Sequence, residues 1–176
     1  RYNSFSEFVN TLSRMVVPGK STFARKLAAK TGLPLYYLDM IWHKPDRTTV
    51  THDEFDTRLS EILNYEDWII DGNYLRTLPM RLQKADTVFL FDLPSEACID
   101  GAISRLGRPR EDIPWTEFVL DEEFRQWILN FSSDQLPVIN LLLDNFSGNV
   151  IKFTSRAQAD KYVIDKLLTS NDNASS

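Results

Sequence analysis

Five consecutive residues, Pro18-Gly19-Lys20-Ser21-Thr22, have the types and the spacing that bind phosphate. Glycine lets the backbone approach an anion closely, and the amides at the start of a following helix point at that anion. A lysine adds positive charge near the β- and γ-phosphates, and a serine hydroxyl can bind Mg²⁺. Gly19, Lys20 and Ser21 therefore match the second half of the phosphate-binding loop G-x-x-x-x-G-K-[ST].

The first half of this loop does not match. Its first glycine would fall at position 14, which is Arg14. Loop residues absent from the given sequence directly before Pro18 would explain the mismatch, and so would a damaged loop. The alternative interpretation of the segment is a turn at Gly19, a helix cap at Ser21 and a solvated Lys20.

Short apolar runs alternate with helical patterns along the rest of the chain. The runs predicted to be strands are Leu35–Leu38, Trp68–Ile70, Thr87–Phe91 and Val150–Phe153. The predicted helices are Ser21–Lys30, Asp53–Leu63, Ser95–Arg105, Phe118–Leu129 and Gln158–Leu168. The apolar runs lack clean alternation of polarity, as strands covered on both faces do, so the pattern predicts an α/β fold with a parallel sheet.

Acidic residues follow three of the predicted strands, namely Asp39, Asp71 and Asp92. Ligands of open α/β sheets bind outside the carboxyl ends of the strands, so this row of carboxylates indicates a metal or a phosphate-bearing ligand. The alternative for each aspartate taken alone is that it begins the next turn.

Composition limits the class of protein. The chain has 176 residues, 43% of them hydrophobic, which is enough for one domain with a sizeable core. The net charge of −5 argues against a generic nucleic-acid binder. A single cysteine excludes an intrachain disulfide. We find no apolar run long enough for a membrane span and no signal peptide, and therefore expect a cytoplasmic protein.

Several further motifs agree with one family. They are Lys20-Ser-Thr-x-Ala-x-Lys-Leu27, Gly32-Leu-Pro34, Leu38-Asp-x-Ile-x-Trp42-x-Lys-Pro45, Trp68-Ile-Ile-Asp-Gly-Asn-Tyr74, Arg76-Thr and Arg81-x-x-x-Ala-Asp86-Thr-Val. With them the chain resembles the bacterial DNA topology modulation proteins, which belong to the adenylate-kinase-like P-loop group. The resemblance covers residues 15–168 as a single kinase-like domain. Residues 1–14 do not fit it and form an atypical N-terminal segment, and residues 169–176 are expected to be a flexible tail.

The resemblance implies a three-layer α/β/α P-loop NTPase fold with a five-stranded parallel sheet in the order 2-3-1-4-5, a short lid, and ATP with Mg²⁺ as cofactors. It implies that Gly19, Lys20, Ser21 and Thr22 hold the nucleotide phosphates. It also implies that Mg²⁺ is held by Ser21 and Asp71, and that the loop at Ser155 and Arg156 lies near the adenine. The alternative for Asp71 is a residue of a strand-end turn.

On the acceptor side, the resemblance implies an acidic residue at Asp39 and contacts from Trp42, Gly72, Arg76 and Arg81. The alternatives are a turn residue for Asp39, a buried aromatic for Trp42 and a surface residue for Arg81. The basic cluster, made of Arg105, Arg108 and Arg110, is expected to close over the phosphates as a lid. Its alternative is a solvated turn paired to Glu111 and Asp112.

Together these residues predict a Mg²⁺-dependent phosphotransferase that uses ATP and a small acceptor, of which a nucleotide is one candidate. Lys20, Asp39, Asp71 and the three lid arginines would take part in catalysis. The alternative function is a nucleotide-binding regulator that modulates DNA topology through a partner, without kinase turnover. A third hypothesis is a folded relic whose broken loop has lost ATP affinity. Membrane binding is not expected, and direct nucleic-acid binding is suggested only by the family name.

Overall fold

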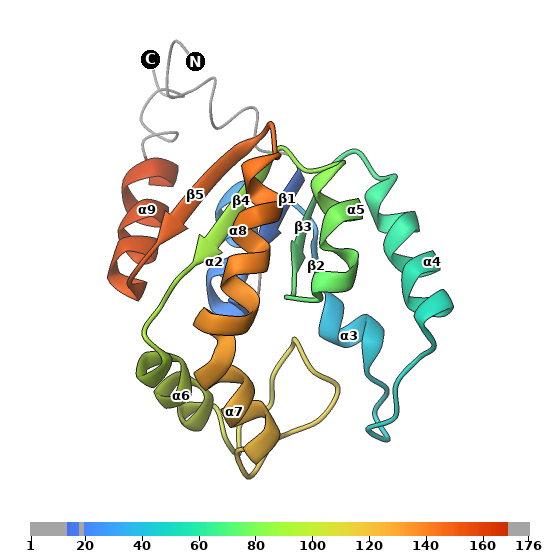
Figure 1. The fold of residues 1–176 in the computed structure, drawn as a ribbon, viewed down its shortest axis with the longest axis vertical. Helices are drawn as coiled ribbons and strands as arrows, with labels where there is room; N and C mark the ends of the chain where they lie inside the picture. The colour runs from blue at the N-terminus through green and yellow to red at the C-terminus, as the bar shows by residue number, and fades with distance from the viewer. Residues whose placement is uncertain (1–13, 18–19, 169–176) are drawn as a thin grey trace.

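The structure is a computed structural model that describes residues 14–17 and 20–168 (Figure 1). Within these ranges, strands alternate with helices, so the predicted α/β class is confirmed. The strands are β1 (Arg14–Val17), β2 (Leu35–Tyr37), β3 (Trp68–Asp71), β4 (Thr87–Phe91) and β5 (Asn149–Phe153). The helices are α2 (Ser21–Thr31), α3 (Leu38–Trp42), α4 (His52–Leu63), α5 (Leu78–Leu82), α6 (Ser95–Ser104), α7 (Glu122–Asn130), α8 (Leu136–Asp144) and α9 (Arg156–Leu168), with a 3₁₀ turn η1 (Leu75–Thr77) and a π-helical turn η2 (Phe131–Gln135).

The strands pair in parallel, in the order β2-β3-β1-β4-β5. Asp71, the last residue of β3, lies in register with Val17 of β1 and with Tyr37 of β2. The carboxyl ends of these three strands therefore meet at one edge of the sheet. In Figure 1 the arrowheads of β4 and β5 point toward the end of the molecule that holds α6, α7 and the segment between them. Side chains that follow the strands are brought together at this end.

Helices cover both faces of the sheet, and each face has its own apolar core. Within β3, Ile69 packs into one core, whereas Trp68 and Ile70 pack into the other. The first core holds residues of α2 and α9, including Phe23, Ala24, Leu27, Ala159 and Val163. The second holds residues of α3, α4, α5 and α8, including Leu38, Phe55, Leu59, Leu78, Leu136 and Ile139. Because both faces are covered, the inner strands β1, β3 and β4 are apolar except for Arg14, Asp71 and Thr87 at their ends.

Two strand boundaries differ from the sequence prediction, and both affect the site. β2 ends at Tyr37, so Asp39 lies in the first turn of α3 and not at a strand end. Arg14, which the sequence analysis assigned to the atypical segment, is the first residue of β1 and pairs with Trp68. Its guanidinium Nε also donates a hydrogen bond to the carbonyl oxygen of Glu66.

The helices after the basic cluster also differ from the prediction. The helix expected at Phe118 begins at Glu122, because the side chain of Asp121 accepts a hydrogen bond from the amide of Phe124 and caps the helix there. α8 was not predicted. Its segment is mostly apolar, with a proline at its second position, and periodicity alone does not distinguish a helix from a strand in so short an apolar run.

Parts of the predicted organisation fall outside the described residues. These are the N-terminal segment before Arg14, the polar tail at 169–176, and Gly19 of the phosphate-binding pattern. Across residues 14–17 and 20–168, no helix combines the length and the apolar character that crossing a membrane requires.

Candidate active site

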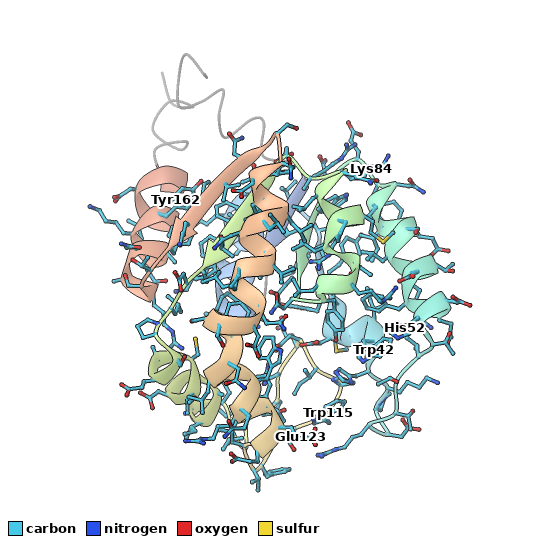
Figure 2. The ribbon with its side chains drawn as sticks, viewed as in Figure 1. Trp42, His52, Lys84, Trp115, Glu123 and Tyr162 are labelled. Carbon is cyan, nitrogen blue, oxygen red and sulfur yellow. The ribbon has the colours of Figure 1, made fainter. Side chains whose placement is uncertain are left out.

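A cavity of about 890 Å³ lies at the carboxyl edge of the sheet. Its walls come from the residues that follow β1, β2, β3 and β4, from the segment after α6, and from α7 and η2. Figure 2 shows Trp42, Trp115 and Glu123 at this end of the molecule. The predicted site residues that line the cavity are Lys20, Ser21, Asp39, Trp42, Asp71, Gly72, Arg105 and Arg110. The tertiary structure therefore brings together eight of the predicted residues, from segments far apart in the sequence.

The first residues of α2 contact two carboxylates in this cavity. The Lys20 amide donates a hydrogen bond to Asp71 Oδ1 at 3.1 Å. The Ser21 hydroxyl lies 2.5 Å from Asp71 Oδ2 and 3.1 Å from Asp112 Oδ2. Negative charge at a helix N-terminus is stabilised by the helix dipole and by the free amides there. This arrangement is therefore a place where the fold accepts anionic oxygens.

Asp71 is almost fully buried, and its environment favours the protonated form. Burial, together with the negative charges of Asp39 and Asp112, raises the pKa of the carboxyl group to about 7. The hydrogen bonds from Ser21 and from the Lys20 amide partly oppose this rise. A carboxyl group with such a pKa can change protonation state near neutral pH, as groups in active sites often do.

The raised pKa of Asp71 predicts a pH-dependent stability. In the unfolded chain the group titrates near 3.8, so its contribution to stability is full below about pH 4 and is lost as the pH rises through about 7. Asp71→Asn removes this titration, and we expect the variant to be more stable than the wild type at pH 8 by on the order of 1–4 kcal/mol. Urea unfolding at pH 5, 6, 7 and 8 measures this difference. Parallel stability curves for the two proteins would contradict the expectation.

Asp112 is a site residue that the sequence did not identify as one. Its side chain is buried, and it lies near Ser21, Arg110 and Arg25. Burial opposes ionisation, but the hydrogen bonds and the charge of Arg110 outweigh it and lower the pKa of Asp112. The sequence analysis considered Asp112 only as a surface partner of the basic cluster. Its contact with Ser21 joins positions 91 residues apart, which no local pattern reports.

The three arginines of the predicted lid have different positions. Arg110 is paired with Asp112 and, at 2.9 Å, with Glu117. Arg105 lines the cavity, and its Nε is buried without a hydrogen-bond partner in the described part of the chain. Arg108 is exposed and does not line the cavity. The pairing with Asp112 that the alternative interpretation expected is therefore present, but it lies in the cavity wall and not in solvent, and the second partner of Arg110 is Glu117 and not Glu111.

Asp39 and Trp42 lie on the wall formed by α3. The hydroxyl of Tyr74 donates a hydrogen bond to Asp39 Oδ1 at 2.6 Å. Burial raises the pKa of Asp39, whereas the hydrogen bond from Tyr74 lowers it in part. The Trp42 ring stacks on His52 at 5.2 Å between ring centroids, and Figure 2 shows the two side by side. Trp42 is therefore both packed against neighbours and part of the cavity lining.

Arg81 does not have the position that the sequence analysis expected. Its side chain is fully buried, and its guanidinium donates hydrogen bonds to the carbonyl oxygens of Gly72 at 3.0 Å and Tyr74 at 2.8 Å. Neither surface exposure nor contact with a ligand is compatible with this burial. Arg76, its neighbour in the predicted acceptor site, is ion-paired with Asp56 at 2.6 Å and does not line the cavity.

Three further predicted residues also lie away from the cavity. Thr22 is exposed and accepts a hydrogen bond from Arg25 at 3.3 Å. Ser155 accepts one from the Gln158 amide at 3.2 Å, in the first turn of α9. Arg156 donates to the carbonyl oxygen of Ala97 at 2.8 Å. These contacts hold helix ends in place and do not point to a ligand.

Cys98, in α6, is partly buried and lines the cavity. Its Sγ lies 3.5 Å from Nζ of Lys20. Lys20 and Cys98 therefore lie together at the side of the cavity nearest α2 and α6.

The oxygen atoms around Ser21 fit the donor set of a Mg²⁺ ion. Mg²⁺ in proteins takes one or two carboxylates and completes its coordination with water and substrate phosphates. The hydroxyl of Ser21 lies within hydrogen-bond distance of two carboxylates, those of Asp71 and Asp112. In the described residues, no group of three or more His, Cys, Asp or Glu side chains could hold a metal ion by itself. A phosphate-bearing ligand would have to complete the coordination.

Comparison with models of protein families gives no match, and no curated protein matches the chain at a significant level.

Proposed function

We propose that the protein binds a nucleoside triphosphate, with Mg²⁺, at the N-terminus of α2 and transfers its γ-phosphoryl group to a small acceptor. One observation carries the proposal. Lys20, Ser21 and Asp71 meet in a cavity at the carboxyl edge of a parallel sheet, which also contains Arg105 and Arg110. Strand order and this location both agree with an adenylate-kinase-like P-loop NTPase fold whose short lid is the segment between α6 and α7.

Each of these residues has a role in phosphoryl transfer that its chemistry allows. Lys20 supplies positive charge to the transferred phosphates, and the α2 amides add hydrogen bonds to the same anion. Ser21 and Asp71 would hold Mg²⁺, which when bound neutralises charge on the phosphates. Arg105 lines the cavity, and its guanidinium would supply positive charge to the γ-phosphoryl group.

Asp39 is the candidate for orienting the acceptor. Its carboxylate lines the cavity and is held by the Tyr74 hydroxyl, which fixes its direction. A carboxylate held in this way can accept the proton of an attacking hydroxyl group or align that hydroxyl for transfer. A role in nucleotide-dependent transfer also agrees with the cytoplasmic location that the sequence predicts.

The length of the β1–α2 connection favours a second function. Only Pro18, Gly19 and Lys20 separate Val17 from Ser21, whereas the full motif places seven residues before its serine. Fewer backbone amides can then surround the phosphates, which weakens both affinity and alignment. The second candidate is therefore a nucleotide-binding regulator without turnover, which would affect DNA topology through a protein partner.

Calorimetric titration of ATP with Mg²⁺ into the pure protein tests both functions. We expect Lys20→Ala to weaken binding by about tenfold or more, because a charged hydrogen bond contributes about 1.5–3 kcal/mol. Lys30→Ala is the matched control, since Lys30 lies in the last turn of the same helix. ADP release in the presence of acceptors separates the kinase from the regulator. Equal affinity of Lys20→Ala and wild type would contradict both, and no binding at all would support the relic hypothesis.

A further inference from the structure

The segment after β3 is held in one conformation from two sides. Gly72 has a φ of +140°, and a Cβ there would lie 2.7 Å from Cβ of Leu38, so only glycine fits. Arg81 binds the carbonyl oxygens of Gly72 and Tyr74 from beneath. The residue between them, Asn73, is therefore presented to the cavity by a rigid backbone.

Asn73 carries an unsatisfied hydrogen-bond acceptor. Its Oδ1 has almost no accessible surface and no hydrogen-bond partner in the described part of the chain, although the residue as a whole is only partly buried and lines the cavity, so a ligand would reach this oxygen after a rotation of the amide side chain. A buried polar atom without a hydrogen bond costs about 1–3 kcal/mol, so a ligand that donates to this oxygen would recover that cost. The neighbouring Tyr74 hydroxyl already donates a hydrogen bond to Asp39. Among the described residues no other side chain donates to this carboxylate, so its remaining lone pairs can accept from a ligand. This side of the cavity therefore presents hydrogen-bond acceptors and favours a ligand that donates hydrogen bonds.

The charges around the cavity disfavour an anionic acceptor molecule. Among the described lining residues, six carboxylates face three cationic side chains; they are Asp39, Asp71, Asp112, Glu117, Asp121 and Glu123 against Lys20, Arg105 and Arg110. Arg110 is already paired with two of these acids. The nucleotide phosphates would require Lys20 and Arg105. The two arginines expected to bind an anionic acceptor, Arg76 and Arg81, are respectively outside the cavity and buried beneath it.

We infer that the acceptor is a neutral or cationic polyol or amino-polyol, and that Asn73 determines this specificity by accepting a hydrogen bond from one of its O–H or N–H groups. The inference rests on the proposed function for the direction of transfer, but it concerns a different part of the cavity. A phosphorylated acceptor such as a nucleoside monophosphate would place a dianion among carboxylates, while among the described lining residues Arg110 is already paired and Lys20 and Arg105 are required by the nucleotide. Neighbouring hydroxyl or amino groups instead find Asn73 Oδ1 and Asp39 as partners.

The test compares matched probes that differ in charge. Adenosine is compared with AMP, and glucose and glucosamine with glucose 6-phosphate, each titrated into the full chain without nucleotide and then assayed for ADP release with Mg²⁺ and ATP. We expect at least one uncharged or cationic probe to bind about tenfold more tightly than its phosphorylated counterpart. A phosphorylated probe that binds as well as its partner would overturn the inference. So would the failure of every uncharged and cationic probe to bind at about 10 mM.

Variants of Asn73 test its assigned role. Asn73→Ala is expected to lower the affinity for the preferred probe by about tenfold, because one hydrogen bond to a buried acceptor is lost. The affinity for ATP is expected to be unchanged. Asn73→Asp keeps the acceptor oxygen and is expected to bind a cationic probe at least as well as the wild type does. Asn140→Ala, at an exposed position of α8, is the control. Unaltered probe affinity in Asn73→Ala would remove Asn73 from the inference. Loss of ATP binding with an intact probe preference would reject the proposed function alone.

Discussion

A variant with Gly-Ser-Gly-Ser inserted between Val17 and Pro18 is expected to bind ATP with Mg²⁺ about 100-fold more tightly than the wild type. The insertion creates the complete pattern G-x-x-x-x-G-K-S, ending at Gly19, Lys20 and Ser21. Two additional backbone amides that each donate to a charged phosphate would contribute about 3 kcal/mol, which corresponds to that factor. The strand before the insertion and the helix after it are already in place, so the inserted residues have only the loop to form.

Calorimetric titration of the insertion variant, beside the wild type, measures the change. The control carries the same insertion together with Lys20→Ala, and its affinity should fall back by about tenfold or more, because the loop acts with the lysine. An insertion variant whose affinity equals that of the wild type would mean that the edge near Ser21 does not hold the phosphates. The proposed function would then lose its main support, although the fold would be unaffected.

Arg81→Ala is expected to lower the free energy of unfolding by about 3–5 kcal/mol. The side chain has no exposed surface, and it satisfies the carbonyl oxygens of Gly72 and Tyr74. Its removal leaves the Gly72 carbonyl oxygen without this donor and the Tyr74 carbonyl oxygen with Thr77 alone, and it opens a cavity under the segment that carries Asn73. Burial also lowers the pKa of the guanidinium to about 9, which the nearby Asp71 carboxylate partly opposes. The protein therefore keeps a costly buried cation for the hydrogen bonds that it makes.

Urea unfolding measures the loss of stability in Arg81→Ala, and Arg76→Ala is the matched control. The Arg76 ion pair with Asp56 is exposed, so its loss should cost at most about 1 kcal/mol. Arg81→Lys is expected to have a free energy of unfolding between those of the two alanine variants, because an ammonium group cannot match the two donors of the planar guanidinium. Similar losses for Arg81→Ala and Arg76→Ala would contradict the structural role assigned to Arg81.

Much of the architecture follows from local sequence. The bulky apolar runs at β3 and β4 predict strands covered on both faces, and the cores on the two sides of the sheet agree with this prediction. The α4 start is set by a capping box between Thr51 and Glu54. α8 was not predicted, because periodicity alone does not distinguish a helix from a strand in a short, mostly apolar run.

Like the fold, the site was predictable from the sequence only in part. The sequence alone determined that Lys20 and Ser21 begin a helix next to a strand and that Asp71 ends another, since these follow from neighbours in the chain. The tertiary structure alone decided that Asp112 reaches Ser21 and that Arg81 is buried under Gly72. Such contacts depend on how loops cross the sheet edge, and side chains brought together from distant segments leave no periodic signal in the sequence.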